Sequence, residues 1–343
     1  MKERPAAAPQ IDARLLDRLL ESDAAVSAYA LSLELGLSNK QLQRELDRLA
    51  AAGCELDRRP HEGVRLARCG LGVWVDYLRW KMPGSGQRIV EVYSQTGSTQ
   101  DAARRLAEHH GQSADGAVVL ADHQTAGRGR LGRRWHAPAG TCVLMSRVCC
   151  GKADHTHLSA DRLVFATSVA LAEALEAMAG SASVKVMIRW PNDLLVDDRK
   201  IGGILVEAFR LGPKLMAAVV GVGINVTLRP DMMPDDEPGL AQTVTSLAMH
   251  GCELPRVAVA ARCIAAIDHA VREDDVAAML DSWRARSVLL GRRVRLRHDE
   301  RQIVGDVVDL DPRDGLIVRM EGGELVHLPA DRTTLVQGKG RRA

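Results

Sequence analysis

Hydrophobic positions in the first part of the chain follow a helical period. Leu15, Leu16, Leu19 and Leu20 form one apolar stripe, and this spacing predicts an amphipathic helix. Two more helices and two short extended runs follow, at Ala28–Leu35, Asn39–Ala52, Cys54–Arg59 and Val64–Leu66. Helices followed by a β-hairpin in this order predict a winged helix-turn-helix domain.

The middle of the chain mixes helical and extended patterns. Helices are predicted at Asp101–His110 and Asp161–Ala179. Strands are predicted at Ala117–Asp122, Cys142–Val148, Val184–Trp190, Ile201–Phe209 and Leu215–Val226. Because the helices are grouped and do not alternate strictly with the strands, the pattern favours an α+β fold with a mixed or antiparallel sheet.

The last part of the chain contains short β runs separated by Asp/Gly turns. They lie at Arg293–Arg297, Ile303–Leu310, Leu316–Met320 and Glu324–Pro329, which predicts a small β-barrel. A breaker, Pro83-Gly84-Ser85-Gly86, marks a linker after the first unit. The predicted segments are a first domain at 1–68, a linker at 69–88, a central domain at 89–288 and a C-terminal domain at 289–343.

Composition narrows the functional classes. The chain has 343 residues, 46% of them hydrophobic, with a formal net charge of +2. Such a small charge argues against a protein that coats nucleic acid or membrane over its whole surface. The seven cysteines form no CxxC pair, so we predict buried or idle thiols in a reducing compartment. The N-terminus has no signal-peptide pattern, and we predict a cytoplasmic protein.

The densest chemical signal is the loop Gly127–Trp135, with the sequence Gly-Arg-Gly-Arg-Leu-Gly-Arg-Arg-Trp. Glycines let a backbone approach a ligand closely, and arginines make bidentate contacts with phosphate or carboxylate. No Gly-Lys-Ser/Thr follows, so this is not a P-loop. An anion-binding loop is therefore predicted, and an exposed, solvated basic loop is the alternative.

Two further motifs lie near predicted strand ends. Arg189-Trp190-Pro191-Asn192-Asp193 ends a strand at a proline, which exposes the asparagine and aspartate at the sheet edge. Lys200 precedes Ile201-Gly202-Gly203 and suits a carboxylate or phosphate, although alone it is an ordinary turn lysine. Gly97-Ser98-Thr99-Gln100 begins a helix and can bind a polar head group, or Ser98 can be only its N-cap.

Together these motifs resemble the catalytic domain of the biotin–protein ligases. The whole chain is similar to the bifunctional members of that family, which are also repressors of the biotin operon. The resemblance covers all three segments and implies a winged helix, a central mixed-sheet, class II synthetase-like domain and a C-terminal SH3-like barrel. It implies biotin, ATP and Mg²⁺ as ligands, biotinyl-5'-AMP as intermediate, and a lysine of a biotin carboxyl-carrier domain as acceptor.

The resemblance also assigns residue roles. Arg128, Arg130, Lys200 and Asp193 are the implied catalytic groups, with Asp193 as a metal ligand or polar organiser. The implied biotin contacts are Ser98, Thr99, Gln100, Gln124, Arg128, Gly129, Arg130, Lys200 and Gly203. The implied adenylate contacts are Arg133, Trp135, Asn192 and Asn225, and the strand Gly221-Val222-Gly223 lines the pocket. Arg189 stands where the family usually has lysine.

The first domain carries a candidate DNA-binding surface. Its predicted contacts are Ser38, Lys40, Gln41, Arg44, Arg48, Arg59 and Arg65. The resemblance implies an adenylate-bound homodimer on biotin operator DNA. Glu45 and Asp47 accompany these basic residues, so three alternatives stay open: a ligase without DNA binding, a winged helix used for protein contacts, and a biotin-sensing regulator without catalysis. A related fold attaches lipoate or octanoate.

Overall fold

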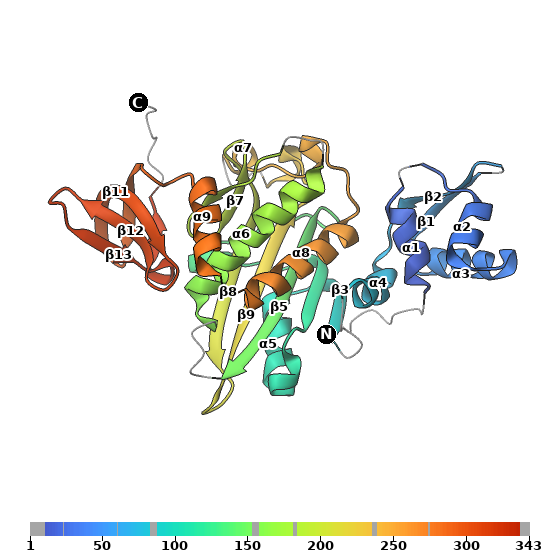
Figure 1. Cartoon of the computed structure of the whole chain (residues 1–343), viewed down its shortest axis with the longest axis horizontal. Coiled ribbons are helices and arrows are strands. Elements are labelled where there is room, and N and C mark those ends of the chain that lie inside the picture. Colours follow the sequence, from blue (N-terminus) through green and yellow to red (C-terminus); the bar gives the residue numbers. More distant parts are fainter. Residues whose placement is uncertain are drawn as a thin grey trace.

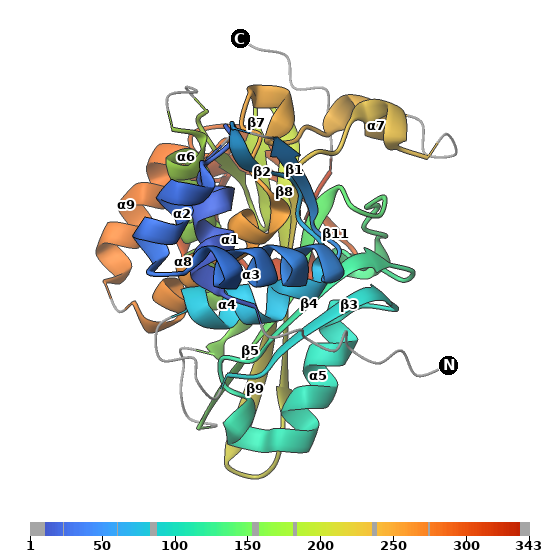
Figure 2. The same cartoon turned by 90° about the vertical axis from the view of Figure 1, so that its right-hand side faces the viewer.

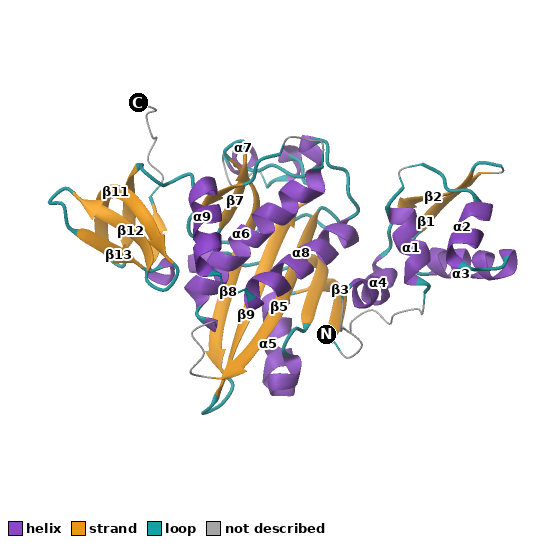
Figure 3. Ribbon diagram, viewed as in Figure 1, coloured by secondary structure: helices purple, strands orange, loops and turns teal. Residues whose placement is uncertain are grey.

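The computed structural model describes residues 11–22, 24–59, 61–82, 88–152, 158–180, 184–234, 239–273 and 275–336. These residues form a small helical unit with a β-hairpin, a large central sheet with helices, and a second, smaller sheet (Figure 1). The two small units lie at opposite ends of the central one, as Figure 3 also shows. Among the described residues, no helix is long and apolar enough to cross a membrane.

The N-terminal unit follows its predicted element order. It consists of α1 (Ala13–Leu20), α2 (Ala28–Leu35), α3 (Asn39–Ala51) and a hairpin of β1 (Glu55–Arg59) and β2 (Gly63–Arg68). Leucines at helical spacing form its core, because each helix turns one apolar face inward. The fully or almost fully buried leucines are Leu15, Leu16, Leu19, Leu31, Leu42, Leu46 and Leu49.

Much of the predicted linker is an ordered helix. Residues Trp74–Lys81 form α4, which packs between α1 and the central domain. Tyr77 Oη donates a hydrogen bond to Asp17 at 2.9 Å, and the Lys81 ammonium lies 2.8 Å from the same carboxylate. The Pro83–Gly86 breaker lies outside the described residues.

The central domain is built on a seven-stranded mixed sheet in the order β3-β4-β5-β9-β8-β7-β6. Only β3 and β4 are parallel, and the other neighbours are antiparallel. The strands are β3 (Val90–Thr96), β4 (Val118–Gln124), β5 (Cys142–Lys152), β6 (Met187–Arg189), β7 (Asp193–Val196), β8 (Arg199–Arg210) and β9 (Leu215–Asn225). The predicted mixed sheet is confirmed.

Helices cover both faces of this sheet. Alternate residues of β4 point to opposite sides, so Val118 and Leu120 join the large core, while Val119 and Ala121 pack with α5 (Thr99–His110). On the large-core side lie α6 (Ala160–Ala179), α8 (Arg256–Arg272) and α9 (Val276–Arg286), as Figures 1 and 2 show. A short helix, α7 (Leu240–Thr243), lies near one end of the sheet.

The C-terminal unit is a five-stranded antiparallel sheet in the order β13-β12-β11-β10-β14. Its strands are β10 (Arg293–His298), β11 (Arg301–Asp311), β12 (Gly315–Met320), β13 (Leu325–Leu328) and β14 (Thr333–Leu335). Four of them match the predicted β runs, and β14 was not predicted. Leu296, Val307, Leu316 and Val318 are buried in its core.

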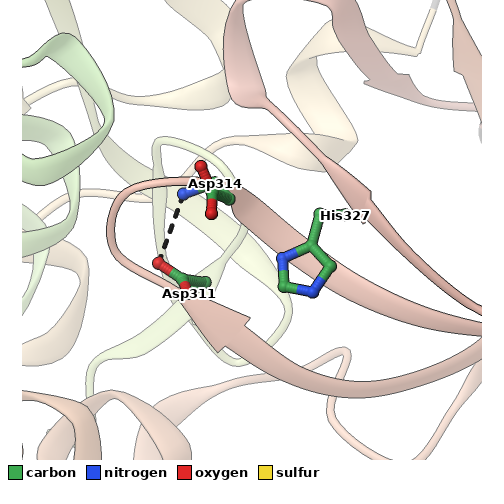
Figure 4. A group of neighbouring side chains, drawn as sticks. All are labelled: Asp311, Asp314 and His327. Atoms are coloured by element: carbon green, nitrogen blue, oxygen red, sulfur yellow. Dashed lines mark hydrogen bonds between the residues drawn. The ribbon is translucent and has the colours of Figure 1, made fainter.

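A group of possible metal ligands lies at the β11–β12 turn. Asp311, Asp314 and His327 bring one ligand atom each within 4.8 Å of one another (Figure 4). Asp311 Oδ1 already accepts the backbone N–H groups of Arg313 at 2.7 Å and Asp314 at 3.3 Å. These two hydrogen bonds stabilise the turn, which accounts for an aspartate at position 311.

Candidate active site

A cavity of about 730 Å³ lies where the Gly127–Trp135 loop meets the ends of several central strands. Most of the predicted ligand contacts line it together, although they are spread over more than a hundred residues of sequence. The predicted residues in the lining are Ser98, Thr99, Gln100, Gln124, Arg128, Gly129, Arg130, Arg133, Trp135, Asn192, Asp193, Lys200, Gly203, Gly221, Val222 and Gly223.

One side of the cavity is lined by neutral polar side chains at the start of α5, one of which, Gln100, also donates to Glu207 at 3.2 Å. Ser98 is the N-cap and accepts the Gln100 N–H at 3.3 Å. The backbone N–H and the hydroxyl of Thr99 both donate to Gln124 Oε1, at 2.7 and 3.0 Å. Ser146 Oγ lies 2.9 Å from both Thr99 Oγ1 and Gln100 Oε1. These partners hold the side chains in fixed orientations for a small polar ligand.

Ser146 was missed by the sequence analysis. It is completely buried in β5, after the apolar run Cys142–Met145. A hydroxyl at the end of an apolar run was the available signal, because a buried polar group requires a hydrogen-bond partner.

The glycine- and arginine-rich loop folds as a small hairpin. Gly129 N–H donates to the Arg133 carbonyl at 2.7 Å, and Trp135 N–H donates to the Gly127 carbonyl at 3.0 Å. The tip contains Leu131 and Gly132, with φ values of 55° and 73°. This left-handed region is accessible to glycine without steric cost, so Gly132 has a direct role in the turn.

The two predicted catalytic arginines of this loop point to different partners. Arg128 makes a bidentate pair with Asp101, both N···O distances being 2.8 Å, and lies 3.5 Å from Glu207. Hydrogen bonding from Arg128 is the largest cause that holds the pKa of Asp101 below its usual range. Arg130 instead donates to the carbonyl oxygens of Ala330 and Thr333 in the C-terminal unit. Burial lowers the pKa of Arg130.

A second cluster, of two cations and one carboxylate, lies on β6, β7 and β8. Asp193 begins β7, and its carboxylate lies 2.6 Å from Lys200 Nζ and 2.8 Å from Arg189 Nη2. Burial raises the pKa of Asp193, but the two cations outweigh it and hold that pKa below the usual value. The three side chains therefore form an ion pair network, in which Asp193 orients Lys200.

Glycines on two paired strands form a slot for an aromatic ring. Gly203 of β8 pairs with Gly223 of β9. A Cβ at Gly223 would lie 2.5 Å from the Trp135 ring, and one at Gly203 would lie 3.0 Å from it. Lys200 Nζ lies 5.0 Å from the centre of that ring, within range of a cation–π contact.

Asn192 and Asn225 differ in position. Asn192 lines the cavity, and its amide donates to the Ile204 carbonyl at 2.7 Å. Asn225 is not among the lining residues; its buried amide donates to the carbonyls of Lys200 at 3.2 Å and Thr245 at 2.9 Å. The Asn225 side chain supports the Lys200 segment from behind, because both of its donors are used there, and its adenylate contact stays a prediction.

The cavity also includes residues that sequence reasoning did not predict. They include Leu131, Arg134, Leu144, Met145, Ile204, Leu205, Leu240 and Thr243 in the central domain and Arg297, Thr334, Leu335 and Val336 in the C-terminal unit. No local motif marks the C-terminal residues. Their contribution depends on the packing of a distant unit against the loop.

The predicted DNA contacts lie on the surface of the N-terminal unit. Lys40 and Arg44 are exposed on α3 and, among the described residues, form no ion pair within 4.0 Å. Ser38 and Gln41 form a capping box at the start of α3. The other predicted basic residues have acidic partners: Arg48 pairs with Glu45, Arg59 with Asp57 and Glu62, and Arg65 with Asp57.

Comparisons with known proteins agree with this geometry. Residues 92–225 match the biotin/lipoate A/B protein ligase family. The chain is 33% identical to the biotin–[acetyl-CoA-carboxylase] ligase of Mycobacterium tuberculosis, over 71% of this chain and 91% of that protein. It is 26% identical to the bifunctional ligase/repressor BirA of Bacillus subtilis, over 87% of this chain and 90% of that protein.

A solved structure shares the fold. The biotin protein ligase of Aquifex aeolicus in complex with biotin and ATP superimposes with a TM-score of 0.59 at 23% identity, covering 73% of this chain and 99% of that one. The chain belongs to the biotin/lipoate A/B protein ligase family, as a biotin–protein ligase.

Proposed function

We propose that the chain activates biotin with ATP to form biotinyl-5'-AMP and transfers the biotinyl group to a lysine of a carrier domain. One observation carries this proposal. The cavity joins an uncharged hydrogen-bonding network, at Thr99 and Gln124, to a cluster of cations that includes Arg128, Arg130 and Lys200. Biotin has the same division, with a neutral ureido ring at one end and a carboxylate at the other.

In the first step, a biotin carboxylate oxygen bonds to the α-phosphorus of ATP, and the bond to the pyrophosphate oxygen breaks. Both reactants are anionic. Lys200 lies closest to the joining site in this proposal, and Arg128 and Arg130 add positive charge from the loop. These cations offset the repulsion and stabilise the charge that develops in the transition state. Trp135, in its glycine slot, is the proposed surface for the adenylate.

In the second step, the neutral amine of the acceptor lysine attacks the biotinyl carbonyl carbon. An amide bond forms, the nitrogen releases one proton to water, the bond to the phosphate oxygen breaks, and AMP leaves. The mixed anhydride hydrolyses in water, so a loop that closes over it protects it. The Gly127–Trp135 hairpin is the proposed cover.

Mg²⁺ fits this site only together with a nucleotide. Asp193 is the one carboxylate among the described residues that line the cavity, and it is paired with Lys200 and Arg189. Protein sites commonly hold Mg²⁺ through one or two carboxylates plus substrate phosphates. We therefore propose that the ion arrives with ATP and supplies charge neutralisation at the phosphates.

The first experiment measures label transfer. The full chain is mixed with ATP, Mg²⁺, labelled biotin and a biotin-acceptor domain, with lipoate as the competing acid. We expect ATP-dependent labelling of the acceptor that excess lipoate does not suppress.

Lys200→Ala is expected to reduce kcat by about 100-fold or more, because one stabilising charge is lost. Lys214→Ala, in the exposed β8–β9 turn, is the matched control and should keep full activity. Biotin binding without any labelling would favour the biotin-sensing regulator.

A second function is favoured by the N-terminal unit. Its element order, with Lys40 and Arg44 exposed on α3, supports a winged helix that binds DNA. In this proposal, the adenylate-bound protein forms a homodimer and represses biotin synthesis genes at a two-part operator. The C-terminal sheet is proposed as the SH3-like barrel of the resemblance, and a carboxylase carrier domain is the proposed acceptor.

A further inference from the structure

Two cysteines face each other at the open end of the N-terminal hairpin. Glu55 of β1 pairs with Arg68 of β2 in antiparallel register, so Cys54 and Cys69 are the next cross-strand neighbours. Opposed residues of an antiparallel pair have Cα atoms about 4.5 to 5.5 Å apart, within the range that a disulfide spans. Both thiols are free in the structure.

The backbone around the two thiols is tightly packed. The Gly70 N–H donates to Cys54 Sγ at 3.4 Å, and the Cys69 thiol donates to its neighbouring carbonyl, Gly70 O, at 3.8 Å. A Cβ at Gly70 would lie 2.4 Å from the carbonyl carbon of Gly53, so only glycine allows this approach. The two chain segments therefore approach each other closely beside the two thiols.

The two thiols differ in reactivity. A hydrogen bond with Cys69 is the largest cause that lowers the pKa of Cys54 to about 7, and burial opposes it. The Gly70 N–H and the charge of Arg68 lower it further. The same interaction raises the pKa of Cys69. A thiolate is the nucleophilic form of cysteine, so Cys54 is the more reactive partner and Cys69 is placed to resolve its oxidation product.

The other five cysteines lack such an arrangement. Burial is the first cause that raises the pKa of each of them, to about 11 for Cys142 and about 12 for Cys150 and Cys263. Cys149 and Cys150 are neighbours in sequence, but adjacent residues of a strand point to opposite faces.

We propose that Cys54 and Cys69 form a reversible dithiol–disulfide site that reacts with a small oxidant of the peroxide class. The Cys54 thiolate attacks a peroxide oxygen, the O–O bond breaks, and the leaving hydroxide takes up a proton to become water. Cys54 is now a sulfenic acid. The Cys69 sulfur bonds to Cys54 sulfur and displaces the hydroxyl as a second water. Two thiols are oxidised to one disulfide, and one hydrogen peroxide is reduced to two waters.

The site lies at the connection to the rest of the molecule. Residues Leu71–Val73 form a short 3-10 turn directly after Cys69 and lead into α4. The first residue of α4, Trp74, lies under the Arg256 guanidinium of α8, at 5.3 Å. A disulfide therefore fastens the base of the hairpin beside the segment that joins it to the central domain.

The test maps thiols in the full-length wild-type chain. The reduced protein is treated with a small excess of hydrogen peroxide, remaining thiols are alkylated under denaturing conditions, and peptides are mapped without reductant. We expect one linked peptide pair containing Cys54 and Cys69, loss of two hydrogens from the intact mass, and reversal by dithiothreitol. The rate should rise with pH through about 7, because the thiolate of Cys54 is the reacting form.

Variants separate this site from general oxidation. Cys54→Ser and Cys69→Ser should each abolish the link, and Cys69→Ser should leave a sulfenic acid at Cys54 that a dimedone probe labels. Cys150→Ser is the matched control, because Cys150 is half-buried like Cys69, and it should keep the link. The proposal is wrong if folded wild-type protein keeps both thiols alkylatable, or if a different cysteine pair links first. Biotin transfer depends on other residues and is measured separately.

Discussion

At the residue scale, two cations of the proposed active site, Lys200 and Arg128, are paired with the protein's own carboxylates. Asp193 neutralises Lys200, and Asp101 neutralises Arg128. A substrate carboxylate or phosphate offers these cations the same kind of partner. Binding therefore exchanges one set of ion pairs for another, and less unbalanced charge is left in the cavity before the substrates arrive.

The glycine slot gives a sharp test of the Trp135 position. Gly223→Ala places a methyl group 2.5 Å from the ring, so the indole must leave the slot. We expect the affinity for ATP and adenylate to fall at least about tenfold, which corresponds to about 1.4 kcal/mol. Isothermal titration with ATP and biotin measures this loss.

Gly212→Ala is the matched control for that substitution. Gly212 lies in the turn after β8, and a Cβ there meets nothing within 4 Å. Its affinity should equal that of the wild type. Unchanged affinity in Gly223→Ala would show that Trp135 does not need this slot for nucleotide binding.

The chemistry of single residues could be predicted where it is concentrated in a short motif. The loop arginines and glycines lie within nine consecutive residues, and all four arginines and Gly129 line the cavity. The contact of Arg130 with Ala330 could not be predicted, because the two are separated by 200 residues and neither belongs to a shared motif. The hydrogen bonds of Asn225 to the Lys200 and Thr245 carbonyls could not be predicted either, because a motif does not show which face of a strand a side chain occupies.

At the element scale, buried ion pairs attach α8 to the sheet. Asp268 of α8 accepts Arg88 at 2.6 and 3.0 Å and Arg147 of β5 at 3.1 Å. The Arg147 side chain is only 3% exposed. Removing the one shared carboxylate leaves two cations with less compensation, and an uncompensated buried charge is costly.

We therefore expect Asp268→Asn to reduce the free energy of unfolding by about 3 kcal/mol, as seen when one partner of a buried pair is removed. Denaturant unfolding measures it. Glu108→Gln breaks the exposed Arg104–Glu108 pair of α5 and should cost less than about 1 kcal/mol. Equal losses in the two variants would refute the assigned role of the Asp268 network.

The same network predicts a pH dependence. Burial raises the pKa of Asp268, but Arg88 and Arg147 outweigh it, so the folded pKa lies below the usual value. Such a carboxylate stabilises the fold when the pH is above the pKa that it has in the unfolded chain, near 4. This stabilisation is lost as the pH falls through the lower pKa that it has in the folded protein. Wild-type Tm should therefore fall more steeply than that of Asp268→Asn below about pH 4. Parallel Tm curves would contradict this.

Elements with strong periodicity could be predicted, and weakly patterned ones could not. Helices α2 and α3 and four C-terminal strands follow their predicted ranges closely, and α1 contains the predicted leucine stripe. Helix α8 was not predicted, because its many alanines give little contrast between its buried and exposed faces. The predicted strand 184–190 is reduced to β6 at Met187–Arg189, and β7 follows after the proline turn.

At the scale of the whole molecule, the units on either side of the central domain are connected to it differently. The C-terminal unit contributes Arg297 and β14 to the cavity wall. Of the described residues of the N-terminal unit, none lies in that lining, and the unit is joined through α4. Ligand binding is therefore expected to depend on the C-terminal unit directly, whereas a DNA-binding role of the N-terminal unit can be tested without disturbing the cavity.

The charges on α3 predict how such binding responds to salt. Each phosphate that a cation neutralises contributes about −0.9 to the slope of log K against log salt for B-form DNA. Lys40 and Arg44 are exposed, and no ion pair within 4.0 Å competes for them among the described residues, whereas Arg48 is paired with Glu45 at 2.7 Å. The double variant Lys40→Ala/Arg44→Ala should therefore reduce the slope by about 2.

Arg48→Ala removes one charge from the same helix and serves as the control. Because Glu45 already neutralises Arg48, its loss should change the slope by less than about 0.9. Fluorescence anisotropy with a labelled duplex of mixed sequence, over a range of salt, measures all three proteins. If the double variant keeps the wild-type slope, α3 does not contact phosphates through these residues, and the ligase without DNA binding becomes the better account of the chain. If only Arg48→Ala changes the slope, DNA would be competing with Glu45 for that guanidinium, and the contact surface would lie further along the helix.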